Sequence, residues 1–128
     1  MPLTARAVLT NDRIARQAGV NLVDFQTYGV LLRQGAPMTP GELANATGLP
    51  SSTTTRVLDR LERTGMVRRE PDAEDRRRTW VRALPFEHPG VAASYAEIVR
   101  RMGEVQQGFT VAELETVARY LDAVKDIR

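Results

Sequence analysis

Five consecutive hydroxyl side chains, from Ser51 to Thr55, follow Pro50 and lead into Arg56. Such residues are poor helix formers and gain little from an apolar core, yet they stand where a helix is expected to begin. Short hydroxyls and free backbone amides at a helix N-terminus can donate hydrogen bonds to phosphates and to base edges. The run therefore indicates nucleic-acid binding, and the plainer interpretation is a capped, solvated amphipathic helix.

A second cluster places three guanidinium groups, Arg76, Arg77 and Arg78, in the charged, turn-forming stretch 71–78. Like charges repel there and no core compensates for the repulsion, so an anionic partner would stabilise the cluster. A thin hairpin tip that carries Arg also fits the narrow minor groove of DNA. The alternative is a solubilising loop, in which the three acids of the same stretch neutralise the basic side chains.

The distribution of charge along the chain also indicates nucleic-acid binding. The 128 residues suit one domain with a single core, and 42% of them are hydrophobic. The net charge is only +2, but nine Arg against six acids give residues 52–82 a charge of +3 and leave −1 for the remainder. The basicity is local and almost wholly arginine, since Lys125 is the only lysine. Arg forms a planar fork that suits phosphate and guanine.

Catalysis finds little support. The single histidine, His88, stands beside Pro89 in a predicted linker and is expected to be a solvated loop residue. The chain has no Cys, which excludes a disulfide scaffold, and any Ser or Thr nucleophile lacks a credible relay. No glycine-rich phosphate loop or calcium-loop spacing is present. We expect no enzyme activity, no metal site and no cofactor. Without a membrane-length apolar run or an apparent signal peptide, the expected location is the cytoplasm.

Helical spacing dominates the chain, and the period changes to two only near its middle. Thr39-Pro40-Gly41-Glu42 is a capping box with Pro at the first helical position of the helix at 39–47. Asn21 is expected to be the N-cap of the preceding helix, at 21–34. The apolar stripe of that earlier helix is expected to include Leu22, Phe25, Leu31 and Leu32. We predict helices over 3–18, 21–34, 39–47, 51–64, 91–105 and 110–124, strands over 66–70 and 79–84, and a linker at 85–90.

The helices at 39–47 and 51–64 are joined by a tight turn at Gly48, which describes a helix-turn-helix. In that motif the second helix enters the major groove. Its buried face is predicted to be Val57, Leu58 and Leu61. Its outward face is predicted to carry Ser52, Thr55, Arg56 and Arg63, with Arg60 at the edge. Because the hairpin follows at once, the whole is a winged helix with both basic features on one surface.

The stretches Met38–Ala44, Leu49–Thr53, Leu58–Arg69 and Asp75–Arg78 closely resemble the MarR family of transcriptional regulators. The resemblance implies a mostly α fold with a small β-hairpin wing, assembled as a homodimer through interlocking N- and C-terminal helices. Many members of that family release DNA on binding a small molecule. On this basis residues 1–128 form a single MarR-like domain. Residues 21–84 are its winged-helix DNA-binding region, and 1–20 and 90–128 are its dimerisation helices.

The resemblance also suggests roles for individual side chains. The predicted DNA-binding residues of the recognition helix are Ser51, Ser52, Thr53, Thr55, Arg56 and Arg60. In the wing, Arg77 is expected to enter the minor groove, with Arg76 and Arg78 beside it. Thr54 departs from the family pattern, because an apolar residue usually packs inward there. We therefore expect this helix to be held less firmly.

Apart from any resemblance, the two C-terminal helices are apolar on faces wide enough to need a partner. The predicted dimerisation residues are Tyr95, Ile98, Met102, Leu114, Val117 and Leu121. The chain's own domain could equally cover the first of these helices. Together with the resemblance, these features predict a homodimeric regulator that binds double-stranded DNA on a near-palindromic operator and is released or modulated by a small-molecule effector. The competing class is a winged-helix module whose basic face binds an acidic protein.

Overall fold

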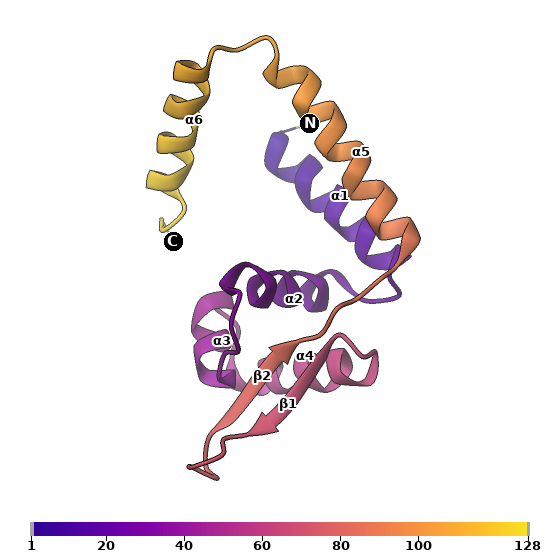
Figure 1. The fold of residues 1–128 in the computed structure, drawn as a ribbon, viewed down its shortest axis with the longest axis vertical. Helices are drawn as coiled ribbons and strands as arrows, with labels where there is room; N and C mark the ends of the chain where they lie inside the picture. Colours follow the sequence, from indigo (N-terminus) through magenta and orange to yellow (C-terminus); the bar gives the residue numbers. More distant parts are fainter. Residues whose placement is uncertain (1, 128) are drawn as a thin grey trace. The chain divides into compact units, whose positions relative to one another are not determined.

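The computed structural model describes residues 2–127, and within them it contains six helices and one two-stranded sheet (Figure 1). The mostly α fold with a small hairpin, predicted from the sequence, is confirmed. Two compact units are present, one ending at Val91 and the other beginning at Ala92. The elements in order are α1 (Leu3–Gln17), α2 (Leu22–Gln34), α3 (Pro40–Thr47), α4 (Ser51–Arg63), β1 (Val67–Pro71), β2 (Thr79–Ala83), α5 (Pro89–Gln106) and α6 (Val111–Val124).

Side-chain caps fix where α2 and α3 begin. The Oδ1 atom of Asn21 accepts a hydrogen bond from the Asp24 amide at 2.9 Å and starts α2, as predicted. The Oγ1 atom of Thr39 accepts one from the Glu42 amide at 3.1 Å and starts α3. Gly48 ends α3 with a φ of 75°, a left-handed conformation that glycine adopts without strain. These local signals place α4 directly after a tight turn.

The core of the first unit lies against one face of α4. Val57, Leu58 and Leu61 are buried there, as predicted, in a cluster that includes Leu43 of α3 and Val81 of β2. Each such side chain contributes about 1.5–3 kcal/mol when it is removed from water. The apolar face of α4 therefore lies in the core, and its opposite face is exposed to solvent.

The hairpin is tied to the helix-turn-helix through the chain that precedes α3. Strands β1 and β2 are antiparallel, with Glu70 opposite Trp80. Met38 forms an added bridge to Val81, in which each amide donates to the other residue's carbonyl, at 3.0 and 2.7 Å. Both strands end within one residue of the predicted bounds; Pro71 lies inside β1 and Met66 outside it.

The predicted apolar stripe of α2 is wrong in part. Leu32 is exposed and Phe25 only half-buried. The buried residues of α2 are Asp24, Thr27, Tyr28 and Leu31. The hydroxyl of Thr27 donates to the Val23 carbonyl at 2.8 Å and that of Tyr28 to the Leu84 carbonyl at 2.6 Å. A polar group that is hydrogen-bonded is tolerated inside a protein, and a search for apolar residues alone misses it.

The second unit comprises most of α5 and all of α6. Helix α5 begins at Pro89 and not at Val91, because the fixed φ of proline suits the first helical position. The capping box of α6 is confirmed: the Glu113 amide donates to Thr110 Oγ1 at 3.1 Å, and the Thr110 amide donates to Glu113 Oε1 at 2.8 Å.

Both C-terminal helices keep their apolar side chains in contact with solvent. No residue described in α5 or α6 is buried. The exposed apolar side chains there are Tyr95, Val99, Met102, Val105, Val111, Val117, Tyr120 and Leu121. In the chain from residue 2 to residue 127, no helix has the length and apolar character needed to cross a membrane.

Candidate nucleic-acid interface

The hydroxyl run at the start of α4 divides between the two faces of the helix. Ser51, Ser52 and Thr55 are exposed, and Thr53 is half-buried. Thr54 is buried, with 1% of its surface accessible, and its hydroxyl donates to the Pro50 carbonyl at 3.0 Å. Thr54 thus occupies the inward position as a satisfied polar residue. The side chains left outside form a surface of short hydroxyls at the N-terminus of the helix.

The arginines of α4 also take different places. Arg56 and Arg63 are exposed. Arg60, also predicted to contact DNA, donates from Nε to Asp24 Oδ2 at 2.8 Å and from Nη2 to Asp24 Oδ1 at 2.9 Å. This bidentate hydrogen bond raises the pKa of the Arg60 guanidinium. Two of its N–H donors thus serve a buried carboxylate, while the side chain stays 39% exposed, so contact of Arg60 with DNA stays a prediction.

Arg69 of β1 joins the hairpin to α4 through two carboxylates. Its Nη2 donates to Asp59 Oδ1 at 2.7 Å and to Glu62 Oε1 at 2.9 Å, and its backbone amide donates to Glu62 Oε2 at 3.0 Å. The hydrogen bonds from Arg69 lower the pKa of Glu62 and raise that of Arg69 itself. The wing is therefore fastened to the recognition helix by charge-assisted hydrogen bonds.

The loop of the wing is ordered by Asp72 and Asp75. Asp72 Oδ1 accepts from Trp80 Nε1 at 2.7 Å, while its Oδ2 accepts from the amides of Glu74 and Asp75 at 3.1 and 2.8 Å. These bonds, that of Trp80 foremost, lower the pKa of the Asp72 carboxyl. Asp75 Oδ1 accepts from the Arg77 amide at 3.0 Å. The three predicted wing residues, Arg76, Arg77 and Arg78, are all exposed on this ordered loop.

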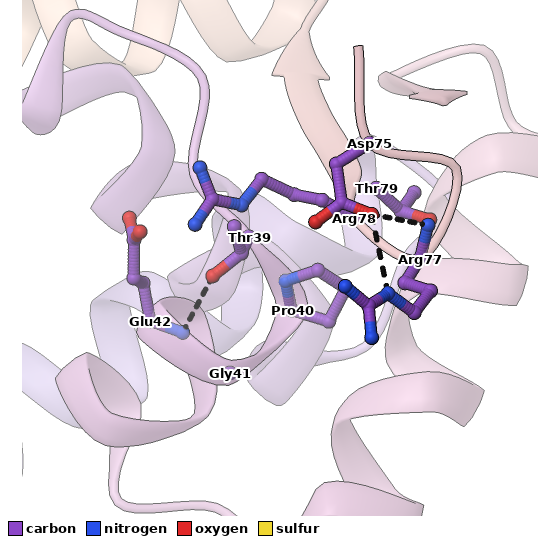
Figure 2. A pocket seen from close by; sticks show the side chains of 8 residues that line it. All are labelled: Thr39, Pro40, Gly41, Glu42, Asp75, Arg77, Arg78 and Thr79. Atoms are coloured by element: carbon purple, nitrogen blue, oxygen red, sulfur yellow. Dashed lines mark hydrogen bonds and ion pairs between the residues drawn. The ribbon is translucent and has the colours of Figure 1, made fainter. Parts of the chain in front are cut away.

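A pocket of about 610 Å³ separates the wing loop from the start of α3. Figure 2 shows Arg78 reaching across it towards Thr39, while Arg77 lies on the other side beside Asp75. Glu42 forms part of the far wall. The residues that line it are Thr39, Pro40, Gly41, Glu42, Asp75, Arg77, Arg78 and Thr79.

Residues suited to metal binding do not gather in the part of the chain that the structure describes. Over residues 2–127, no three His, Cys, Asp or Glu side chains come together as a group that could hold a metal ion. His88 stacks against Phe86, with ring centroids 6.3 Å apart, and its Nδ1 accepts from the Val91 amide at 3.4 Å. It serves as a local cap of α5.

The groups that position the surface escaped the sequence analysis. Asp24 pairs with an arginine 36 residues further along the chain. Arg69 binds two carboxylates 7 and 10 residues before it, and Trp80 binds a carboxylate 8 residues before it. The one available signal was a charged residue at an inward-facing position, as at Asp24, because a buried charge requires a partner.

The helix-turn-helix, the hairpin wing and the exposed hydroxyl and arginine residues define a winged-helix protein of the nucleic-acid-binding class. The sequence model of the MarR family matches residues 18–78. An uncharacterised HTH-type transcriptional regulator of Bacillus subtilis (strain 168), YcgE, is 31% identical over 125 residues, covering 98% of this chain and 80% of that protein. The chain belongs to the MarR family of transcriptional regulators, which are not enzymes.

Solved structures share the fold. A point mutant of MepR from a multidrug-resistant S. aureus clinical isolate superposes with a TM-score of 0.80 at 20% identity, covering 95% of this chain and 88% of that one. Another point mutant of S. aureus MepR, solved bound to an oligodeoxyribonucleotide, gives a TM-score of 0.67 at 20% identity, covering 95% and 89%. At this identity the likeness concerns the fold alone.

Proposed function

We propose that this MarR-family regulator binds double-stranded DNA sequence-specifically as a homodimer. The observation that carries the proposal is the exposed surface at the start of α4, where Ser51, Ser52, Thr55 and Arg56 have no place in the core. Thr53, half-buried, lies at its edge. Hydroxyls and a guanidinium at a helix N-terminus suit base edges and phosphates of the major groove. The oligonucleotide bound to a MepR mutant gives support from a protein of the same fold.

The wing supplies the second part of the proposed contact. The Arg77 side chain is 94% exposed, and its ion pair with Asp75 is long, at 3.4 Å from Nε to Oδ1. An arginine at a hairpin tip can enter a narrow minor groove, where the electrostatic potential of DNA is most negative. Arg76 and Arg78 add positive charge on the same loop.

A second copy of the chain would account for the apolar faces of α5 and α6. Val99 is 68% exposed, Val105 65% and Leu121 57%, which is costly for isolated helices in water. In a two-fold dimer the two recognition helices would reach successive major grooves about 34–36 Å apart, so the operator would be a near-palindrome. We place the protein in the cytoplasm with the chromosome. Because the chain resembles a family in which many members release DNA on binding a small molecule, we also propose that a small-molecule effector releases this protein from its operator.

A salt-titrated binding assay tests the proposal. An operator selected from random duplexes is compared with bulk DNA, and affinity for both should fall steeply as salt rises while the operator stays preferred. Arg56→Ala should reduce the preference for the operator more than it weakens binding to random DNA. Equal losses on both would mean that Arg56 touches phosphate only.

The competing function is a winged-helix module that binds an acidic protein through the same basic surface. The exposed guanidiniums of Arg56, Arg63 and Arg77 suit acidic side chains as well as phosphates. A protein that shows no preference among duplexes at any salt concentration would favour this alternative. A preferred sequence would exclude it.

A further inference from the structure

The wing holds Arg78 differently from Arg77. The guanidinium carbon of Arg78 lies 5.6 Å from the centroid of the Trp80 ring, within the distance of about 6 Å at which a cation is attracted to an aromatic face. The side chain of Arg77 makes the long ion pair with Asp75 and is almost fully exposed. One guanidinium is therefore positioned before any partner arrives, and the other is free to adapt.

Trp80 is itself fixed. Its Nε1 donates to Asp72 Oδ1 at 2.7 Å, and the second oxygen of Asp72 accepts from two amides of the loop. The Asp72 amide in turn donates to the Arg78 carbonyl at 2.9 Å. The ring, the carboxylate and the backbone of Arg78 thus form one hydrogen-bonded unit, so the ring face cannot turn away from the guanidinium without breaking it.

The guanidinium of Arg78 lies at the pocket between the wing and the start of α3. The side chain projects across the space between the wing and Thr39 (Figure 2). A planar guanidinium there can donate two parallel hydrogen bonds to a phosphate. Two acids, Glu42 and Asp75, also line the pocket, and they oppose the entry of a free anion. For a phosphate of a duplex, the free energy of binding to α4 would offset that repulsion.

We propose that Arg78 binds one backbone phosphate of the duplex in this pocket and that Trp80 and Asp72 are its positioning residues. The inference rests on the proposed DNA-binding function, and it assigns different roles to two arginines of the wing. Arg78 anchors the wing to the backbone, and Arg77 alone probes the minor groove. A phosphate contact contributes equally to every sequence, whereas a groove contact depends on the width of the groove.

The test measures affinity for the selected operator and for a random duplex across a salt series. Arg78→Ala should weaken both about tenfold and reduce the slope of log K against log salt by about 0.9, the effect of one lost phosphate contact. Trp80→Leu should act in the same direction, and Trp80→Phe should restore part of the loss because it keeps an aromatic face. Arg119→Ala, which removes one exposed charge from α6, should leave affinity and slope unchanged.

The outcomes separate the inference from the function on which it rests. If Arg78→Ala behaves like Arg119→Ala while the wild type still prefers its operator, the Arg78 assignment is wrong and DNA binding stands. If the wild type prefers no duplex, the proposed function itself fails. A loss in Arg78→Ala without any loss in Trp80→Leu, shown by circular dichroism to be folded, would overturn the positioning role of Trp80.

A further arm distinguishes a duplex phosphate from a free one. Trp80 is the only tryptophan, so its emission reports on the surroundings of the Arg78 guanidinium beside its ring. Operator DNA should change the emission, and inorganic phosphate at constant ionic strength should not. A saturable change with inorganic phosphate would identify a free-anion site and overturn the assignment to the DNA backbone.

Discussion

Arg60 of the recognition helix grips the carboxylate of Asp24 in α2 with two hydrogen bonds, at 2.8 and 2.9 Å. The Asp24 side chain is only 3% exposed, whereas that of Arg60 is 39% exposed. The pair therefore bridges from the interior to the surface and fixes the rotation of α4 about its axis. An arginine predicted to contact DNA thus also links α4 to α2.

Asp24→Asn should lower the free energy of unfolding by roughly 1–3 kcal/mol, because it removes the charge that the half-exposed Arg60 pairs with. Denaturant unfolding measures this. Asp122→Asn is the matched control, since its ion pair with Lys125 is exposed on both sides and should be worth less than about 1 kcal/mol. Equal stability changes in the two variants would contradict a structural role for the Asp24–Arg60 pair.

Thr54→Val should leave stability unchanged or raise it by up to about 1 kcal/mol. The Pro50 carbonyl already accepts from the Thr54 amide at 2.9 Å, so loss of the hydroxyl leaves no acceptor without a partner. A methyl group then replaces a polar group in a buried site. Thermal unfolding provides the measurement, and a marked loss of stability would show that the hydroxyl is needed.

Arg77→Ala should weaken binding to DNA by roughly 1–3 kcal/mol if the side chain enters the minor groove. The free energy of unfolding should change by less than about 0.5 kcal/mol, because the residue lies exposed at a loop tip. Titration of labelled duplex with both proteins at moderate salt gives the comparison. Unchanged affinity would remove Arg77 from the interface.

The wing should loosen in acid. The pKa of Asp72 lies below its usual 3.8, since its hydrogen bonds favour the ionised carboxylate. A group whose folded pKa is lowered contributes its stabilisation above the unfolded pKa and loses it as the pH falls through the folded value. Trp80 emission should therefore be constant above about pH 4 and change below it. In Asp72→Asn this acid-dependent change should be absent; its persistence there would assign it to another carboxyl.

Leu121→Glu should separate the proposed dimer, because it places a charge on an exposed apolar face of α6. Light scattering should give a mass of about twice 14.3 kDa for the wild type and about 14.3 kDa for the variant. Arg119→Ala on the same helix should remain dimeric. A wild type that stays monomeric at micromolar concentration would defeat the dimer model.

Local signals in the sequence were enough to predict most of the fold. The caps at Asn21, Thr39 and Thr110 and the left-handed Gly48 act within a few residues, so their effect can be read along the chain. The buried face of α4 follows from helical spacing alone. The resemblance then gave the family, which the comparisons confirm.

The sequence did not reveal which arginines are already occupied. Three arginines that the sequence does not distinguish have different partners in the structure. Arg60 pairs with Asp24, and Arg69 pairs with Asp59 and Glu62. Arg77 makes a long ion pair through its side chain. Those pairings depend on how α2, α4 and β1 come together in space. A pattern of residue types carries no information about such distances.

The clamp of Arg69 on Asp59 and Glu62 also affects tolerance to operator spacing. With the wing and the recognition helix fastened together, their two proposed DNA contacts move as one body. Insertion of one base pair between half-sites turns one of them by about 35° around the DNA axis, as follows from 10–10.5 base pairs per turn. In the proposed dimer, a protomer whose two contacts move together meets that rotation with both of them misplaced, so we expect weaker binding to such an operator.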